Sequence, residues 1–449
     1  MDSIELKICN IIDKHRQELI DFGHDIWNHA ELGFQEYRTA GLFADKMKGL
    51  GLKTQENLAL TGVKSYLSNT QGGPNICLMG ELDGLPIPTH KNANPDTGAA
   101  HCCGHNAQLT GVLGAAIALS ALEVRPYIDG NVIFFAVPAE EYVEIEKRGE
   151  MKDQGLIRYG CGKSELLRLG EMDDIDIVVG HHATTKKQYL VANRTCNGFI
   201  TKIVRFEGLA AHAAGEPSHG IDAMSAANIA MHAVDVQRES FRDSDTVRVH
   251  GFISRGGEAA NIIADDIRLE YSIRGKTIPS YIDAGLKVDR SMRAGAEAVG
   301  CGLSITTLPG NLPIVPVKDA SVVAEALALV SGETSVTISG PDAHSTSSGD
   351  YGDVSSIMPL LQFNTGGFRG ALHTPDLQED DLDDAYVIPA KVFALIAYKL
   401  LKNGGDRARA IIDSFEAILT KEKYIKLMES MLTTENIPIK QLPLLDSLK

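Results

Sequence analysis

The chain has 449 residues, of which 44% are hydrophobic and 23% are charged, and its formal net charge is −16. Two domains are expected, because this length exceeds what one hydrophobic core usually organises and the composition is that of a globular protein. The acidic balance and the scattered lysines and arginines argue against nucleic acid or an anionic membrane as the main partner.

The N-terminal segment and the cysteines bear on the cellular compartment. Residues 1–19 are polar and amphipathic, unlike a signal peptide, and no run of about 18 apolar residues could span a membrane. Seven cysteines spread along the chain differ from a secreted disulfide framework. We therefore expect a cytoplasmic protein with reduced thiols.

Helical and strand patterns alternate through the first part of the chain, which favours an α/β fold. Residues 4–24 and 38–50 have helical patterns, the second of which stops at Gly51. Residues 106–123 carry apolar side chains at helical spacing and many small residues, so this helix is expected to pack on a sheet.

Three apolar segments end in side chains that can bind a metal or move a proton. They are 75–83 with Glu81 and Asp83, 131–141 with Glu140 and Glu141, and 175–183 with His181 and His182. Because parallel strands present their carboxyl ends at one edge of a sheet, we expect these side chains to lie together.

The pattern changes near residue 195. From there to residue 311 the chain reads as a strand, an Ala-rich helix and strands with alternating polar and apolar residues, as in a half-exposed antiparallel sheet. Residues 312–449 return to helices. We predict a two-domain α/β protein with a split catalytic domain, 1–194 and 312–449, and an inserted α+β domain, 195–311.

The segment AAHCCGHNAQ (99–108) precedes the small-residue helix and holds two histidines and two adjacent cysteines. Adjacent cysteines rarely bond to each other, so a disulfide is not expected, and Cys102 is interpreted as a packed thiol. Cys103 and His105 alone fit core packing and helix capping as well as they fit metal binding.

The Glu140–Glu141 pair is more specific. Adjacent carboxylates near a core repel each other unless a cation or separate roles divide them. One can bind a metal while the other acts as a general base on water. The alternatives are a solvated strand end for this pair, a surface turn for His181 and His182, and a surface loop for His373. Taken together, these residues suffice for two metal ions that share a water.

The motifs GELDGLP, HCCGHN, VPAEE, HH and ALHTP, in this order and spacing, resemble the zinc-dependent aminoacylase and carboxypeptidase-G superfamily, in its amidohydrolase branch. The resemblance covers nearly the whole chain, including residues 27–40, 208–227 and 256–266. Asn106, the segment EIEKRG and residues 348–359 are closest to p-aminobenzoyl-glutamate hydrolase-like proteins.

The resemblance implies a role for each matching residue. The metal ligands of two divalent ions, zinc or manganese, are Cys103, His105, Glu141, His182 and His373. Glu140 matches the general base and Asp83 an acid that supports the site. His212 matches an imidazole that stabilises the oxyanion, and Asn261 and Arg274 match the region that binds a substrate carboxylate. Whether Glu81 ligates, and whether His181 takes the place of His182, stays open; Asn106 stands where Asp is more usual.

The implied function is metal-dependent hydrolysis of an N-acyl or N-aroyl amino acid with a free carboxylate. The resemblance also implies an inserted domain that forms a homodimer and closes over the cleft. A dipeptidase or carboxypeptidase with the same site is one alternative. A catalytically silent metal-binding relative is the other, although the intact Glu140–Glu141 pair weighs against it.

Overall fold

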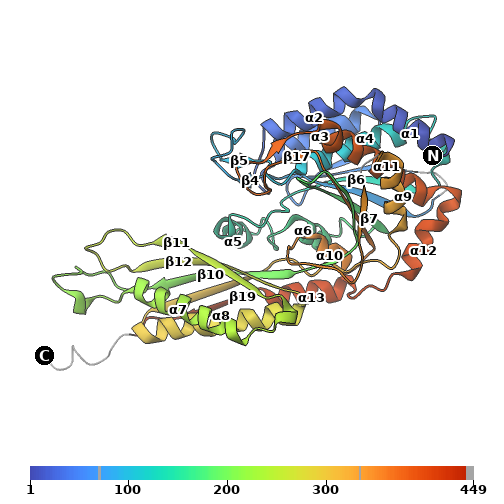
Figure 1. Cartoon of the computed structure of the whole chain (residues 1–449). Coiled ribbons are helices and arrows are strands. Elements are labelled where there is room, and N and C mark those ends of the chain that lie inside the picture. The colour runs from blue at the N-terminus through green and yellow to red at the C-terminus, as the bar shows by residue number, and fades with distance from the viewer. Residues whose placement is uncertain (69–71, 333–334, 441–449) are drawn as a thin grey trace.

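The computed structural model describes residues 1–68, 72–332 and 335–440 and contains two domains, each with its own sheet (Figure 1). From edge to edge, the large sheet consists of β1 (Lys53–Leu58), β2 (Gly62–Leu67), β6 (Asn131–Val137), β3 (Asn75–Glu81), β7 (Ile177–Ala183), β16 (Leu360–Thr365), β8 (Tyr189–Ala192) and β14 (Val336–Ser339). The predicted α/β class is confirmed.

The four central strands of this sheet, β6, β3, β7 and β16, run parallel. They are apolar throughout because both faces of the sheet are covered. Ile76 and Leu78 of β3 pack into the core on one face, and Cys77 and Met79 pack into the core on the other. The carboxyl ends of β3, β6 and β7 therefore lie at one edge, as the sequence predicts.

Helices from both ends of the chain cover the first face. They are α1 (Ser3–Lys14), α2 (Arg16–Asn28), α3 (Tyr37–Gly49), α4 (His105–Ser120), α9 (Ser321–Val330) and α11 (Ile388–Leu401), with α12 (Asp406–Ser414) beside α11. Residues 105–119 of α4 are all buried, which explains why this helix is apolar on every side. The predicted helix over 4–24 is two helices that meet at His15.

Shorter elements lie around the other face and the loops. They include α5 (Ile145–Asp153), α6 (Gly162–Leu169) and α10 (Tyr351–Ser355). Three small strand pairs are β4 (Leu85–Pro86) with β5 (Ala99–Ala100), β9 (Thr195–Cys196) with β15 (His344–Ser345), and β17 (Phe368–Arg369) with β18 (Gln378–Glu379). The β9–β15 pair ties the start of the inserted domain to the second part of the catalytic domain.

The inserted domain is an antiparallel sheet with two helices on one face. Its strands, in spatial order, are β11 (Arg248–Gly256), β12 (Asp266–Gly275), β10 (Gly198–Glu207), β13 (Gly302–Pro309) and β19 (Thr433–Ile437). The helices are α7 (Ala223–Gln237) and α8 (Ile278–Val299). Ala226 and Ala230 of α7 face Gly295 of α8 so closely that a side chain at Gly295 would clash with them. The small residues of α7 therefore serve packing within this domain.

The structure differs from the predicted division of the chain in one respect. Residues 312–449 were expected to lie wholly in the catalytic domain, but Thr433–Ile437 pairs with β13 of the inserted domain. The helix before it, α13 (Lys421–Met431), buries Tyr424 and Met428 in the core shared with that domain. The strand covers an edge of β13 that would otherwise present unpaired backbone groups.

Within the described residues, no helix combines the length and the apolar character that crossing a bilayer requires.

Candidate active site

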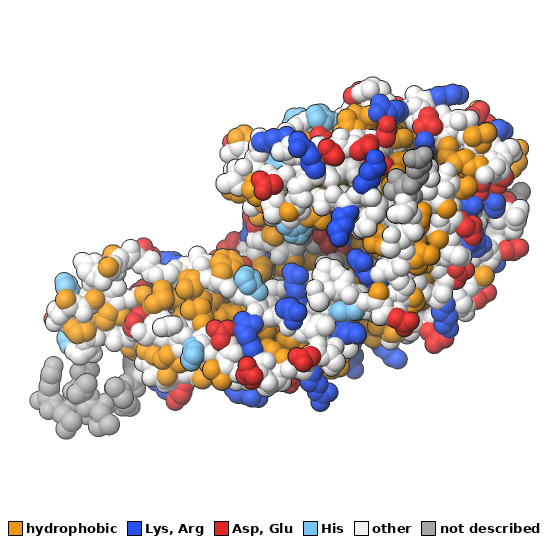
Figure 2. All heavy atoms as spheres, in the orientation of Figure 1, with side chains coloured by type: hydrophobic (Ala, Val, Ile, Leu, Met, Phe, Trp, Pro, Cys, Tyr) orange, Lys and Arg blue, Asp and Glu red, His pale blue; other side chains and the backbone are white. Residues whose placement is uncertain are grey.

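The candidate site forms where the carboxyl ends of β3, β6 and β7 meet the start of α4. Figure 2 shows a hollow between the two domains with histidine side chains (pale blue) inside it. Gly104 precedes α4 with φ +82, and a Cβ there would lie 2.6 Å from the Cβ of Ala183 in β7. This close approach requires glycine and brings Cys103 and His105 against the end of β7.

Cys103 lies at the centre of the first group of side chains. Its Sγ is 3.4 Å from His182 Nε2 and 3.4 Å from His373 Nε2. His373 Nε2 is also 3.2 Å from Glu141 Oε1. The loop that carries His373 is tied to the cysteine segment, because its backbone N–H donates to the Cys102 carbonyl oxygen at 2.8 Å. Four predicted ligands thus converge from four separate segments.

His105 joins this group to a set of carboxylates. Its Nδ1 lies 2.8 Å from the Asp83 carbonyl oxygen, which only accepts, so Nδ1 carries the hydrogen and Nε2 presents a lone pair. That Nε2 is 3.1 Å from Glu81 Oε2 and 3.9 Å from Glu140 Oε2. Electron-pair donors therefore face one another around Nε2.

These donors fit divalent cations. The ligand atoms of Cys103, His105 and Glu141 all lie within 4.8 Å of one another, and so do those of Glu81, His105 and Glu140. His105 Nε2 and Glu141 Oε1 are buried and make no hydrogen bond, although buried polar atoms usually have one. Sulfur, nitrogen and oxygen donors in two overlapping groups are typical of a two-ion site.

Asp83 organises the acidic pair. It is fully buried, and its two carboxylate oxygens accept the backbone N–H groups of Glu140 and Glu141 at 3.1 and 2.9 Å. Burial acts to raise the pKa of Asp83, but the hydrogen bond from His105 and its charge hold that pKa below the usual value. The carboxylate is therefore ionised and can orient both the turn and the imidazole.

Glu140 has the electrostatic setting of a proton carrier. Burial, together with the charges of Glu81 and Glu141, raises its pKa well above the usual value for a glutamate. Its side chain is 15% exposed, so it faces the hollow while its neighbours are buried more deeply. Burial and the charge of Glu141 also raise the pKa of the Cys103 thiol, so a cation is needed to favour its thiolate.

A buried lysine adjoins the site, and sequence reasoning missed it. Lys163 Nζ donates to Glu81 Oε1 at 2.6 Å and to the Asp350 carboxylate, and it lies 4.2 Å from the centre of the Tyr351 ring. Gln108 Nε2 donates to the other Glu81 oxygen at 2.7 Å. A single lysine in a short helix carries no sequence signal of burial, and Asp350 stands out only as part of a segment that resembles the family.

The structure also places the residues whose roles were open. His181 points away from the site, since its Nε2 pairs with Thr365 Oγ1 at 2.8 Å and its ring packs on Phe363. His182 is the neighbour that reaches Cys103. Asn106 Nδ2 donates to the Gly23 carbonyl oxygen and to the Tyr386 hydroxyl, at 3.2 and 2.8 Å. An aspartate there would place a carboxylate oxygen against that carbonyl, which explains the amide.

Arg274, in contrast to two other predicted residues of the inserted domain, lies near the centre. It stands opposite Phe199 in the β10–β12 pair, with its guanidinium 5.8 Å from the Phe199 ring centre. Burial lowers the pKa of Arg274, and the charges of Glu141 and Glu140 act to raise it. The guanidinium is therefore within electrostatic reach of both acids.

His212 and Asn261 lie at the other end of the inserted domain. They belong to loops next to Glu207 and Asp266, at the end of the β10–β12 pair opposite to Arg274. The Ala213 N–H donates to the Asn261 carbonyl oxygen at 3.0 Å, so the two loops contact each other. Over the described part of the chain, neither residue is brought to the metal-ligand groups of its own chain.

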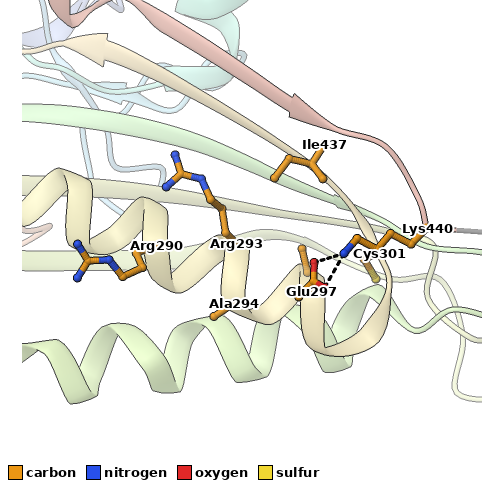
Figure 3. Close-up of a pocket in the computed structure, with 8 residues that line it drawn as sticks. Arg290, Arg293, Ala294, Glu297, Cys301, Ile437 and Lys440 are labelled. Atoms are coloured by element: carbon orange, nitrogen blue, oxygen red, sulfur yellow. Dashed lines mark hydrogen bonds and ion pairs between the residues drawn. The ribbon is translucent and has the colours of Figure 1, made fainter.

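A separate cavity of about 360 Å³ lies in the inserted domain between α8 and β19 (Figure 3). Two of its basic side chains are already paired with acids, Arg293 with Glu435 and Lys440 with Glu297. None of the predicted site residues lines it. The cavity is therefore distinct from the candidate active site.

Comparison with known proteins gives one family match and several relatives. The model of peptidase family M20/M25/M40 matches residues 77–398. The chain is 27% identical over 309 residues to IAA-amino acid hydrolase ILR1-like 2 of Arabidopsis thaliana, covering 66% of this chain and 65% of that protein. It is 28% identical over 289 residues to a p-aminobenzoyl-glutamate hydrolase chain of Escherichia coli (strain K12), covering 61% of this chain and 54% of that protein. The chain thus spans less than two thirds of either relative.

Two solved structures share the fold. One is the aminobenzoyl-glutamate utilization protein from Klebsiella pneumoniae, with a TM-score of 0.64, 17% identity, and coverage of 88% of this chain and 98% of that chain. The other is the Bacillus subtilis YXEP protein, described as a dinuclear metal binding peptidase, with a TM-score of 0.60, 19% identity, and coverage of 87% and 99%.

Proposed function

We propose, given that the chain belongs to peptidase family M20/M25/M40 and is a hydrolase of that family, that it cleaves the amide bond of an N-acyl or N-aroyl amino acid with a free carboxylate. p-Aminobenzoyl-glutamate is the representative substrate. The family match confirms the resemblance that the motifs predicted. The printed names of the relatives, a p-aminobenzoyl-glutamate hydrolase and an IAA-amino acid hydrolase, both denote an amino acid joined to an aromatic acid.

The observation that carries this proposal is the Glu140–Glu141 pair beside the overlapping donor groups. Cys103, His105, Glu141, His182 and His373 would hold two divalent ions, zinc or manganese. Such ions lower the pKa of a water and polarise a carbonyl. Glu140, whose pKa is raised, takes the proton from the attacking water and then delivers it to the nitrogen of the leaving amine.

The free carboxylate of the substrate is assigned to Arg274. A guanidinium pairs with a carboxylate through two parallel hydrogen bonds, and Arg274 is close enough to feel the charges of Glu140 and Glu141. The site would therefore favour substrates whose carboxylate lies one amino acid away from the scissile bond. His212 and Asn261 keep their predicted roles with the oxyanion and the carboxylate only if a second chain supplies them.

We propose, accordingly, a homodimer formed through the inserted domain. Apolar side chains (orange) gather on this domain in Figure 2. Phe252 of β11 and Val236 of α7 are 55% and 59% exposed, and β11 is an edge strand. Exposed apolar side chains on an uncovered edge are typical of an interface. The seven free cysteines support a cytoplasmic location.

A dipeptidase is the second candidate, and it too has a named relative. The Xaa-Arg dipeptidase of Mus musculus is 26% identical over 381 residues, covering 80% of this chain and 79% of that protein. A dipeptidase requires a free amine next to the scissile bond, whereas an amidohydrolase accepts an acylated one. The two candidates therefore differ in one substrate group.

A substrate screen separates the candidates. Protein stripped by a chelator is supplied with Zn²⁺ or Mn²⁺ and offered p-aminobenzoyl-glutamate, N-acetyl amino acids and free dipeptides. We expect metal-dependent hydrolysis of the first two classes and little of the third. Hydrolysis of free dipeptides alone would favour the dipeptidase, and inactivity on all three classes with either metal would favour the silent relative.

A further inference from the structure

The turn after β6 that carries the acidic pair has an unusual backbone. Ala139, directly before Glu140, has φ +47, a left-handed conformation that residues with a side chain rarely adopt. Both Glu140 and Glu141 take their direction from this turn. Such a conformation persists only where the surrounding structure holds it, so the contacts of the turn decide how accurately the acids are placed.

Three successive amides of the turn donate to two buried carboxylates. The Glu140 and Glu141 N–H groups donate to Asp83, as described above. The Ala139 N–H donates to Glu36 Oε1 at 2.8 Å. On the other side, the Ala139 carbonyl oxygen accepts the Gly162 N–H at 3.0 Å. Glu36 is therefore the partner that fixes the left-handed residue itself.

Glu36 comes from a distant part of the sequence and is fully buried. It lies immediately before α3, in the segment 27–40 that resembles the family, and its exposure is 0%. Its second oxygen accepts the Thr61 hydroxyl at 2.6 Å. Both donors are uncharged, so an ionisable acid is a costly choice if it serves packing alone.

We infer that Glu36 is a positioning residue for the catalytic turn: by holding the Ala139 amide, it aims Glu140 at the substrate and Glu141 at the metal. This inference rests on the proposed function, which assigns those two roles. Arg148 supports the same turn from the other side, because it donates to the Glu141 carbonyl oxygen and stacks 5.5 Å from the ring centre of Phe34, two residues before Glu36. The helix-start segment and the turn therefore form one unit.

The test compares three substitutions of Glu36 with a matched control. Glu36→Gln keeps an oxygen within reach of the Ala139 amide, Glu36→Asp keeps the charge but is one methylene too short, and Glu36→Ala removes both. Glu5→Ala is the control, since Glu5 is also buried and accepts a backbone N–H, at 2.7 Å from Asp2, but pairs with Lys399 of α11. Zn²⁺ affinity is measured by competition with a chromophoric chelator, and kcat and KM on the best substrate of the screen.

We expect Glu36→Asp and Glu36→Ala to weaken Zn²⁺ binding roughly tenfold and to lower kcat about 100-fold with little change in KM. Glu36→Gln should restore most of both, and Glu5→Ala should lower thermal stability alone. If Glu36→Ala does not fold, the Asp and Gln variants carry the comparison.

Two results would overturn the inference. One is wild-type Zn²⁺ affinity and kcat in Glu36→Asp, which would leave only a structural role. The other is a loss in Glu36→Gln as large as in Glu36→Asp, which would make the charge and not the hydrogen bond responsible. Failure of the proposed function shows separately, as wild-type protein that binds Zn²⁺ but hydrolyses nothing.

Discussion

At the scale of single residues, the centre is built from hydrogen bonds that leave the ligand atoms free. His105 uses Nδ1 for the Asp83 carbonyl, and this leaves Nε2 for a cation. Asp83 uses its carboxylate for two backbone amides and so does not compete for the ion. The ligands are therefore oriented before any ion binds, which reduces the ordering that metal binding requires.

Asp83→Asn should weaken Zn²⁺ binding roughly 10- to 100-fold, because the amide group would face one backbone N–H that needs an acceptor. Asp176→Asn is the matched control: Asp176 accepts the Asn75 N–H at 2.8 Å at the opposite end of β3. Chelator competition measures both variants. Equal affinities in wild type and Asp83→Asn would show that this carboxylate does not orient the ligands.

The two adjacent histidines should separate in the same assay. His182→Ala removes a ring 3.4 Å from Cys103 Sγ, so we expect a large loss of bound metal. His181→Ala removes a ring packed against Phe363 and should lower the melting temperature while the bound metal stays near two ions per chain. The reverse pattern would assign the ligand to His181.

Glu36 should also make stability depend on pH. Burial, and then the charge of Asp83, raises its pKa to about 7 from 4.5. A raised acid pKa means that the folded state binds more protons, so this contribution is complete below pH 4.5 and is lost as the pH rises through 7. Urea unfolding between pH 4.5 and 8 should show a decline of ~3 kcal/mol that Glu36→Gln removes. A parallel decline in both proteins would assign it to other groups.

At the scale of elements, α6 and α10 meet β3 through buried charges. Lys163 of α6 bridges Glu81 at the end of β3 and Asp350 just before α10. The exposures of these three side chains are 0%, 2% and 0%. Because buried ions are stable only when paired, the lysine fixes how these elements sit against the site and leaves one Glu81 oxygen directed at His105.

Lys163→Met should destabilise the fold by about 3–5 kcal/mol, since it leaves two acids buried without their cation. The double variant Lys163→Met, Asp350→Asn should recover part of that loss because one of the unpaired charges is gone. Denaturant unfolding of the single and double variants measures the coupling. Additive losses would mean that Lys163 and Asp350 do not act as a pair.

The same elements mark how far sequence reasoning reaches. Apolar strands ending in acids or histidines predicted the edge where the site forms, since parallel strands share their carboxyl ends. The contacts of Lys163 and Glu36 could not be predicted, because each depends on a partner that is distant in sequence, Asp350 and Ala139. The strand over Thr433–Ile437 was missed because a short polar segment acquires its structure only from the edge of β13.

At the scale of the whole molecule, the site lies between a large parallel sheet and an inserted antiparallel one. The sequence predicted this division because the hydrophobic pattern changes from continuous apolar runs to alternation near residue 195. Arg274 lies at the end of the inserted sheet near the centre, and His212 lies at the other end. One chain therefore supplies only part of the predicted set from its inserted domain.

The proposed dimer can be tested on its exposed face. Phe252→Asp or Val236→Asp should convert a dimer to a monomer in sedimentation velocity, because a charge would enter an apolar interface. Leu122→Asp is the control, since Leu122 is 88% exposed at the end of α4 in the catalytic domain. A wild-type protein that sediments as a monomer at all concentrations would exclude the dimer.

The most direct measurement of the central claim pairs metal content with activity in Glu140→Gln. Wild-type and variant protein are stripped, reloaded with Zn²⁺ and analysed for bound metal, and hydrolysis of p-aminobenzoyl-glutamate and N-acetyl amino acids is then followed. Glu144→Gln, which removes a partly exposed acid paired with Lys147 in the same segment, is the control. We predict two ions per chain in all three proteins and a loss of about 100- to 10,000-fold in kcat for Glu140→Gln alone. Hydrolysis by metal-loaded Glu140→Gln at the wild-type rate would contradict the account.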